Sequence, residues 1–257
     1  MALLEITDLS LSFSGLHALV NVSFNVAEGE IAGLIGPNGA GKSTLLNCIS
    51  RLYRPERGRI RFDGTNLLDR KSHEVAAMGV RRTFQNLELF REASVRENVT
   101  LGLMYRCKSS LLSELLDLPP SRATRMAATE EAARIIEACG LSDVADLPVS
   151  GLPYGLQKSV ELARALAGRP KLLLLDEPAA GMNPEESRRV VEIVRRLRDN
   201  DGITVLLIEH DMRVVMTACD RVVVLDHGEK IGEGSPAEIR RAPAVIKAYL
   251  GDEPAHA

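Results

Sequence analysis

One short segment, Gly36 to Thr44, constrains this sequence more than any other feature. It reads Gly-Pro-Asn-Gly-Ala-Gly-Lys-Ser-Thr and fills every fixed position of the Gly-x4-Gly-Lys-Ser/Thr phosphate-binding loop. The residues just before it are typical of a short buried strand, and Lys42 to Ile49 carry the apolar stripe of a helix. A strand, a glycine-rich turn and a helix in this order predict a phosphate site at the start of the helix.

The residue types in this loop suit anionic oxygens. Successive backbone N–H groups in the turn and in the first helical turn form a concave anion site, and glycines leave room for phosphate. Lys42 is expected to reach the β- and γ-phosphates, and Ser43 to bind Mg²⁺. The predicted nucleotide-binding residues of the loop are Gly36, Pro37, Asn38, Gly39, Ala40, Gly41, Lys42, Ser43 and Thr44.

Composition argues against several other classes of protein. The 257 residues are 45% hydrophobic, enough for a large α/β core, and the net charge of −3 gives no overall attraction to nucleic acid. We interpret the arginines between Arg51 and Arg61 as a solvated face. Four scattered cysteines without a Cys-x-x-Cys pair indicate reduced thiols in a cytoplasm. No apolar run approaches bilayer length and no signal peptide is evident, so a membrane role has to come through a partner.

The N-terminal residues predict two strands. Apolar and polar residues alternate from Leu9 to Phe13 and again from Val20 to Val26. Phe13 has two interpretations: it stacks on an adenine ring lying over the phosphate loop, or it is an ordinary core residue of the alternating series. We adopt the first and count Phe13 among the nucleotide-binding candidates.

Between the loop and the next buried strands, the sequence predicts short elements and then helices. A strand and turn are expected at 59–64, a short helix at 72–78, and a strand at 80–84 that delivers Gln85. Ser94 is a plausible N-cap for one helix, and Ala123 to Cys139 predict another. With the mixed segment 107–121, these helices indicate an inserted helical subdomain. Near the end, 222–231 predict a hairpin and Pro236 to Tyr249 a helical tail.

Two aliphatic strands end in side chains that carry chemistry. The run 171–175 leads to Asp176 and Glu177, and the run 203–208 leads to His210. Ligands bind at the carboxyl ends of parallel strands, so we expect Asp176 to hold Mg²⁺, Glu177 to orient or deprotonate a water, and His210 to contact the γ-phosphate. The alternatives are a carboxylate pair that merely opens the next helix and a structural histidine.

These residues, in this order, resemble the ATP-binding subunits of ABC transporters over essentially the whole chain. The resemblance rests on the phosphate loop, Gln85 after a strand, the Asp176-Glu177 strand and His210. It implies an α/β fold: a P-loop NTPase core with a mostly parallel sheet, an N-terminal antiparallel β subdomain and an inserted α-helical subdomain. The implied catalytic residues are Glu177, His210 and Gln85, and the implied metal ligands are Ser43, Gln85 and Asp176.

The resemblance also implies the domain limits. Residues 1–86 and 169–235 form the catalytic core with its β subdomain, about 87–168 form the helical subdomain, and 236–257 form a C-terminal helical tail. Gln85 lies at the junction between core and helical subdomain, where a groove in the helical part receives a short helix of the membrane subunit.

The family's Leu-Ser-Gly-Gly-Gln signature corresponds to Leu152, Pro153, Tyr154, Gly155 and Leu156. In the family this segment contacts the ATP held by the opposite subunit of a dimer. This sequence departs from the pattern at Pro153, Tyr154 and Leu156. Proline has neither a hydroxyl nor a backbone N–H, so the trans contact to ATP is expected to be weakened unless Tyr154 or the helix N-terminus compensates. The alternative is that Pro153 is simply a structural start in the first turn of the helix.

The details look like the branched-chain amino-acid importer branch, specifically its longer ATPase subunit. They are the Tyr154-Gly155 pair, the run 179–184 with Asn183 in place of the family's usual aspartate, and the ending 244–250. The resemblance implies ATP and Mg²⁺ as cofactors, a second identical or different ATP-binding subunit, two permease subunits and an extracytoplasmic solute-binding protein. It implies a peripheral location at the cytoplasmic face of a bacterial inner membrane, and no nucleic-acid partner.

Three alternatives remain open. The chain could serve an importer of urea or short amides, whose ATPase subunits look much alike. It could be a soluble ABC protein acting on ribosomes or DNA, although such proteins usually carry two cassettes or a long coiled-coil insertion, and neither is present. It could be a regulatory nucleotide-binding subunit with a weakened signature, although Glu177 and His210 indicate that its own site keeps catalytic equipment.

Overall fold

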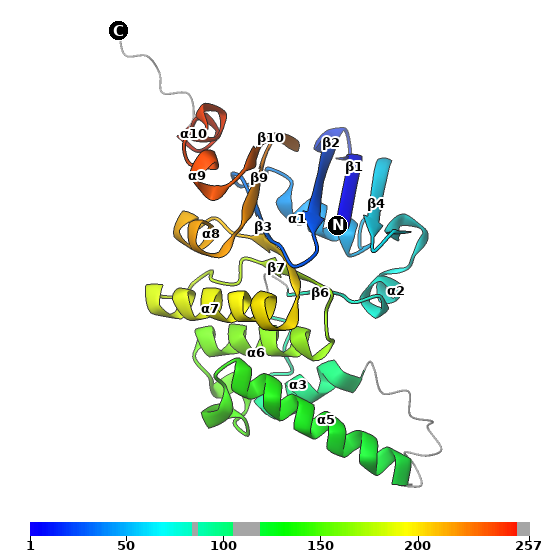
Figure 1. The fold of residues 1–257 in the computed structure, drawn as a ribbon, viewed down its shortest axis with the longest axis vertical. Helices are drawn as coiled ribbons and strands as arrows, with labels where there is room; N and C mark the ends of the chain where they lie inside the picture. The colour runs from blue at the N-terminus through cyan, green and yellow to red at the C-terminus, as the bar shows by residue number, and fades with distance from the viewer. Residues whose placement is uncertain (84–86, 105–118, 251–257) are drawn as a thin grey trace. The chain divides into compact units, whose positions relative to one another are not determined.

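The computed structural model describes residues 1–83, 87–104 and 119–250 of the chain (Figure 1). The chain forms two compact units, and each unit is assembled from separate segments. Unit 1 consists of residues 1–82, 171–179 and 187–257, and unit 2 of residues 83–170 and 180–186. The chain thus passes between the units after Arg82, Pro170, Ala179 and Glu186. The domain limits expected from the sequence stay a prediction.

Unit 1 contains a six-stranded, mostly parallel sheet. In sheet order its strands are β10 (Glu229–Gly234), β9 (Arg221–Asp226), β3 (Ile31–Ile35), β8 (Thr204–Ile208), β7 (Leu172–Asp176) and β6 (Val80–Arg82). Every pair is parallel except the hairpin of β9 and β10. All residues of β3, β7 and β8 are buried, which explains their continuous aliphatic sequences. The predicted mostly parallel sheet is confirmed.

A second, antiparallel sheet has the strand order β2 (Leu16–Ala27), β1 (Ala2–Phe13), β4 (Arg57–Phe62) and β5 (Thr65–Asn66). Its alternating sequence buries one face and exposes the other. Arg57, Arg59 and Arg61 lie on the exposed side, as expected for a solvated face. Arg51 differs, because its guanidinium donates hydrogen bonds to three backbone carbonyl groups and therefore has a structural role.

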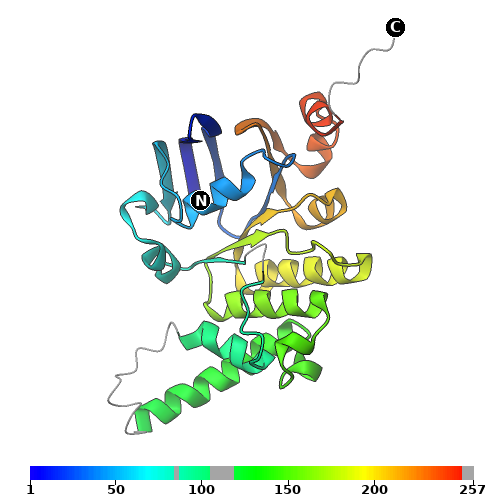
Figure 2. The ribbon, with the colours of Figure 1, turned by 180° about the vertical axis from the view of Figure 1, so that it is seen from behind.

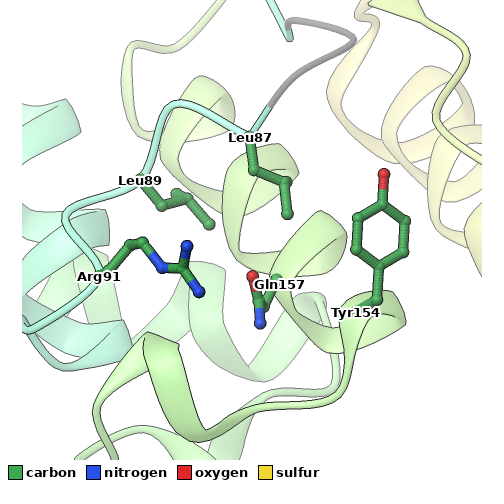
Figure 3. A pocket seen from close by; sticks show the side chains of 5 residues that line it. All are labelled: Leu87, Leu89, Arg91, Tyr154 and Gln157. Atoms are coloured by element: carbon green, nitrogen blue, oxygen red, sulfur yellow. The ribbon is translucent and has the colours of Figure 1, made fainter.

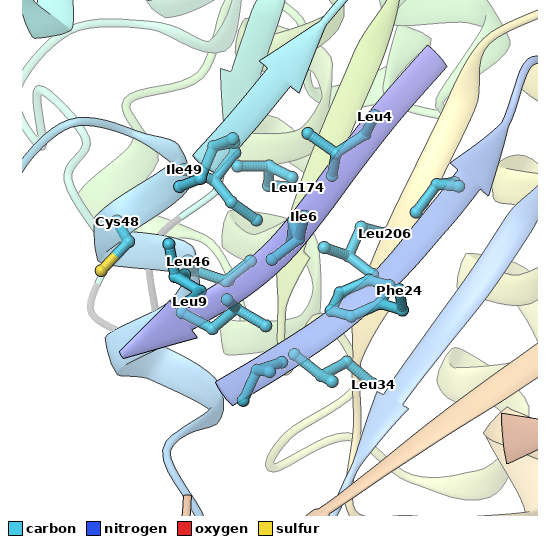
Figure 4. Packing of buried hydrophobic residues seen from close by; sticks show 14 of the residues in the cluster. Leu4, Ile6, Leu9, Phe24, Leu34, Leu46, Cys48, Ile49, Leu174 and Leu206 are labelled. Carbon is cyan, nitrogen blue, oxygen red and sulfur yellow. The ribbon is translucent and has the colours of Figure 1, made fainter. Parts of the chain in front are cut away.

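The core of unit 1 packs helix α1 (Lys42–Ile49) against strands of both sheets (Figure 4). Leu46 and Ile49 of α1 lie with Leu4 and Ile6 of β1, and Leu174 of β7 belongs to the same cluster. Full burial of such a side chain stabilises the fold by about 1.5–3 kcal/mol. This packing fixes the helix that begins in the phosphate loop. The other helices that lie wholly or mainly in unit 1 are η1 (Leu67–Asp69), α2 (Ser72–Ala77), α7 (Pro184–Asp201), α8 (Met212–Ala218), α9 (Pro236–Ile239) and α10 (Pro243–Leu250).

The predicted helical tail from Pro236 to Tyr249 is helical but is not continuous. The structure has two helices there, α9 and α10, with a break at 240–242. Pro243 explains the break, because proline disfavours helical backbone in the residue before it and is well suited to open a new helix.

Unit 2 is helical, and α3 (Val95–Met104), α5 (Pro119–Ala138) and α6 (Tyr154–Ala167) lie side by side within it (Figures 1 and 2). It also contains η2 (Ser142–Val144) and η3 (Val149–Gly151). Ser94 caps α3 as predicted: its hydroxyl accepts a hydrogen bond from the Glu97 N–H at 3.1 Å. The predicted segment 107–121 lies mostly outside the described residues. None of the helices that the structure describes is long and apolar enough to cross a membrane.

Candidate nucleotide-binding site

The phosphate loop joins β3 to α1, as the sequence predicts. Gly41 is the N-cap of α1 with a left-handed backbone (φ 97°), and no side chain caps this helix. Its first turn carries no acidic residue, so the N–H groups and the positive end of the helix dipole are placed to receive an anion. Asn38, Gly39 and Ser43 are exposed along the loop, whereas Lys42 is buried.

The three predicted phosphate-site glycines differ in what surrounds them. A Cβ atom on Gly36 would lie 2.1 Å from the carbonyl oxygen of Leu225, and one on Gly41 would lie 2.5 Å from that of Ala18. A Cβ on Gly39 would meet no atom within 4 Å. Gly36 and Gly41 are therefore required by the protein's own backbone packing, while Gly39 faces open space in the loop.

Lys42 reaches back across the loop. Its Nζ donates to the carbonyl oxygens of Gly36 at 2.7 Å and Pro37 at 2.9 Å. Burial lowers the pKa of Lys42, and the nearby Glu177 and Asp176 carboxylates act in the opposite direction. An ammonium group has three donors, so Lys42 uses two of them to hold the loop while its charge stays at the phosphate site.

Asp176, the predicted metal ligand, forms a buried ion pair with Arg82. Arg82 Nη2 lies 2.8 Å from Asp176 Oδ2, and Arg82 Nη1 donates to Asn47 Oδ1 at 2.7 Å. Arg82 is a residue that sequence reasoning missed. Its signal was an arginine at the end of a short strand, because in a buried sheet such a charge needs a partner.

Glu177 and His210 are brought together by the ends of neighbouring strands β7 and β8. His210 Nδ1 lies 3.8 Å from Glu177 Oε1, and the histidine side chain is 60% exposed. Glu177 has a left-handed backbone (φ 51°), which is uncommon for a residue other than glycine, and its N–H donates to the Ile208 carbonyl oxygen at 3.0 Å. Gln85, the third predicted catalytic residue, lies outside the described residues.

A second carboxylate, Glu209, lies beside this pair and was missed by sequence reasoning. It is 1% exposed and accepts hydrogen bonds from the N–H groups of Ala179 at 2.9 Å and His210 at 3.2 Å. Burial raises the pKa of Glu209, against the effect of these hydrogen bonds and of His210. The contacts tie the end of β8 to the segment that follows Glu177.

The signature residues belong to unit 2 and open helix α6. Pro153 is the N-cap, with φ −54° and ψ 149°, and Tyr154 is the first helical residue. Proline therefore stands just before the first turn and not within it. Leu152 is buried, whereas Pro153 and Tyr154 are exposed.

The run 180–186 packs against the signature within unit 2. A Cβ on Gly181 would lie 3.2 Å from the Tyr154 ring, and one on Gly155 would lie 2.7 Å from Glu186 Oε1. Asn183 caps helix α7, because its Oδ1 accepts from the N–H groups of Glu185 at 2.9 Å and Glu186 at 3.0 Å. Asparagine and aspartate are comparable helix caps, so this local structure suits either residue.

Phe13 is not a core residue. It is 42% exposed and its ring makes an edge contact with Tyr53, with ring centroids 5.2 Å apart. The alternative interpretation of Phe13 as part of the alternating core is therefore wrong. Stacking on an adenine ring stays a prediction.

Unit 2 has a pocket next to the signature (Figure 3). It measures about 290 Å³ and is lined by Leu87, Leu89, Arg91, Tyr154 and Gln157. The Gln157 side chain is fixed by a hydrogen bond, because its Nε2 donates to the Leu152 carbonyl oxygen at 2.7 Å. The pocket combines two leucines, an aromatic ring and an arginine, a lining suited to an amphipathic segment of another chain.

A glycine loop between a buried strand and a helix, with a lysine in the loop and carboxylates at the end of the strand two places away in the sheet, defines a phosphate-loop nucleotide-binding domain. Comparison with known proteins gives its family. The ABC transporter family matches residues 19–180, and the family described as branched-chain amino acid ATP-binding cassette transporter matches residues 229–255. The chain belongs to the ABC transporter family and is one of its ATP-hydrolysing, nucleotide-binding subunits.

Relatives and solved structures agree with this assignment. The chain is 43% identical over 250 residues to the high-affinity branched-chain amino acid transport ATP-binding protein LivG of Salmonella typhimurium, covering 97% of this chain and 98% of that protein. A nucleotide-free ATP-binding cassette from an ABC transporter is 32% identical, with a TM-score of 0.85 over 98% of this chain and 100% of the other. A dimeric cassette, MJ0796 bound to ADP and Pi, is 26% identical, with a TM-score of 0.77 over 91% and 98%.

Proposed function

We propose that this chain couples MgATP hydrolysis to the uptake of branched-chain or related amino acids. The observation that carries the proposal is the near full-length similarity to LivG, at 43% identity. The match of residues 229–255 to a branched-chain amino acid cassette family supports it from a second part of the chain.

In this function the loop and Lys42 bind the nucleotide phosphates, and Phe13 stacks on the adenine. Ser43 and Asp176, together with Gln85, would hold Mg²⁺, which when bound neutralises phosphate charge. The residues fit such a cation, since a hydroxyl and a carboxylate are the hard oxygen donors that it prefers. Glu177 orients or deprotonates the attacking water, and His210, 3.8 Å from Glu177, contacts the γ-phosphate.

The proposal includes a second ATP-binding subunit, identical or different. The phosphate loop belongs to unit 1 and the signature to unit 2. In the proposed dimer, a partner's signature, corresponding to Leu152 to Leu156, would close over each ATP. The dimeric structure of MJ0796 bound to ADP and Pi supports the presence of a second subunit. ATP would drive closure of the dimer, and hydrolysis would release it.

We further propose that the subunit sits at the cytoplasmic face of a bacterial inner membrane beneath two permease chains, which receive solute from an extracytoplasmic binding protein. The pocket lined by Leu87, Leu89 and Tyr154 supports docking of a short permease helix on unit 2. A nucleic-acid partner is not part of the proposal, and the net charge of −3 agrees with that.

The test is ATP-dependent uptake by the complete transporter, purified with its permease and reconstituted in vesicles. We expect uptake of labelled leucine, isoleucine or valine, none with Lys42→Ala, and none with Glu177→Gln although the latter still binds MgATP. Uptake of urea or a short amide alone would assign the chain to that importer class. ATP binding without hydrolysis in the complete complex would make it a regulatory subunit.

A further inference from the structure

The pairing of Arg82 with Asp176 goes beyond the roles described so far. Both side chains are almost fully enclosed, with 9% and 4% of their surfaces exposed, and the charged atoms are 2.8 Å apart. The same guanidinium holds Asn47 of α1 through its other terminal nitrogen. One arginine therefore connects the end of β6, the end of β7 and the helix that Lys42 begins.

A carboxylate this deeply buried is costly unless a positive charge or several hydrogen bonds balance it. Arg82 supplies such a charge directly to Asp176 Oδ2. A divalent cation at the phosphate site would draw on the same carboxylate charge, because Mg²⁺ is held by carboxylate oxygens and nucleotide phosphates. Arg82 and the cation therefore compete electrostatically for one group.

We propose that Arg82 is a positioning residue that balances the charge of Asp176 when no cation does so, and that it thereby sets how weakly the site holds Mg²⁺. Arg82 keeps the carboxylate in place for the cation, at the cost of lowering its attraction for that cation. The inference rests on the proposed function, because it needs a Mg²⁺-nucleotide site at Asp176.

The test measures the thermal stability of the full-length chain, so it does not depend on ATPase activity. The melting temperature is recorded at increasing Mg²⁺ concentrations in the presence of saturating ADP, for the parent, Arg82→Gln and Arg82→Lys. Arg221→Gln is the matched control. Arg221 also forms a partly buried ion pair, with Glu30 at 2.7 Å, but this pair lies at the start of β3, whereas the phosphate loop follows the end of β3.

For Arg82→Gln we expect the nucleotide-free melting temperature to fall by on the order of 10 °C, because the buried Asp176 carboxylate loses its direct ion-pair partner at 2.8 Å. The Mg²⁺ concentration at half of the ADP-dependent rise should fall about tenfold, because the competing charge is gone. Arg82→Lys keeps the charge without the planar fork and should be intermediate in both measurements. Arg221→Gln should have a lower melting temperature than the parent, but the same Mg²⁺ concentration at half of the ADP-dependent rise (the Mg²⁺ half-point).

An Arg82→Gln variant that melts earlier but keeps the parental Mg²⁺ half-point would show that Arg82 is only a structural partner, and would overturn the proposal. If Arg82→Gln does not fold, Arg82→Lys decides: an unchanged or higher half-point counts against the proposal. If the melting temperature of the parent does not rise with Mg²⁺ in the presence of ADP, the proposed function is contradicted. If the parent shows this rise but Arg82→Gln has the parental Mg²⁺ half-point, only the role proposed for Arg82 is contradicted.

Discussion

Single residues of the phosphate loop have separable duties. A Cβ atom on Gly36 would clash with the carbonyl oxygen of Leu225, whereas a Cβ atom on Gly39 would meet no atom within 4 Å. Both glycines have positive φ angles, and Gly39, with φ 82°, is the one that lies in an open part of the loop. The first glycine therefore serves folding, and the second serves access to the loop.

This difference predicts opposite effects of alanine at the two positions. Gly39→Ala should cost about 1–2 kcal/mol of stability from its left-handed backbone and should remain folded, but lose most of its nucleotide affinity because the methyl group enters the phosphate approach. Gly36→Ala should lower the melting temperature much further, because the Cβ clashes with backbone. Calorimetric unfolding and ADP titration measure both; equal stability of the two variants would contradict the assignment.

Glu209 gives a prediction about pH. Its pKa is raised by burial, so the stability that its protonated form contributes is present below the ordinary glutamate value and is lost as pH rises through the raised one. Glu209→Gln is uncharged throughout. The melting temperature of Glu209→Gln minus that of the parent should therefore increase as the pH is raised from 5 to 8.

Glu209 accepts hydrogen bonds from the backbone N–H groups of Ala179, His210 and Asp211, and its carboxylate lies 4.0 Å from the His210 ring, so the difference between the two curves reports Glu209 together with its coupling to His210. A difference that stays constant across the pH range would show that burial does not disfavour the charged form of Glu209.

At the scale of the element, helix α6 lacks a side-chain cap because its N-cap is Pro153. Pro153→Ser should stabilise the isolated subunit by about 1 kcal/mol through capping alone. It should also strengthen ATP-driven pairing, because a serine hydroxyl can donate to a phosphate of the opposite subunit. Both effects are measured in a Glu177→Gln background, with the physiological partner if it is a different chain.

Pro153→Asp separates the two effects. Aspartate caps a helix as well as serine does, but its charge repels phosphate. Both variants should melt later than the parent, and only the serine variant should dimerise at a lower MgATP concentration. If the serine variant needs as much MgATP as its parent, Pro153 is not a weakened trans contact.

Elements with a strong local pattern could be predicted from the sequence. The bounds of α1, the buried strands that end at Asp176 and Ile208, and the cap at Ser94 all depend on nearby residues. The partners of Arg82 and Glu209 could not be predicted, because Asp176 and Ala179 are far away from them in sequence. Pro243 indicates the break in the tail, but the apolar periodicity on either side of it favoured an uninterrupted helical tail in the prediction.

At the scale of the whole molecule, the two units are interleaved along the chain. Strand β3, which leads into the phosphate loop, pairs with β8 and β9 from the last quarter of the sequence. These are contacts of very large sequence separation, which form late and slowly in folding. The loop is thus complete in sequence long before its supporting strands exist.

A shortened chain tests this dependence. Residues 1–201 contain the whole phosphate loop and Asp176 but neither neighbour of β3. We expect this fragment not to bind ADP, and chains that extend past β10 to bind it. Protease protection by ADP over a series of lengths provides the measurement, and protection of the 201-residue fragment would contradict the prediction.

During synthesis, the same topology leaves the growing polypeptide without nucleotide for most of its time on the ribosome. Two apolar edges of β3 have no neighbouring strand until β8 and β9 emerge, and such unpaired edges favour association with other chains. We expect that cellular ATP does not stabilise an early intermediate, because the strands that support the phosphate loop emerge late. Slow translation or premature termination before residue 204 should therefore yield material that aggregates or is degraded, whatever the ATP concentration in the cell.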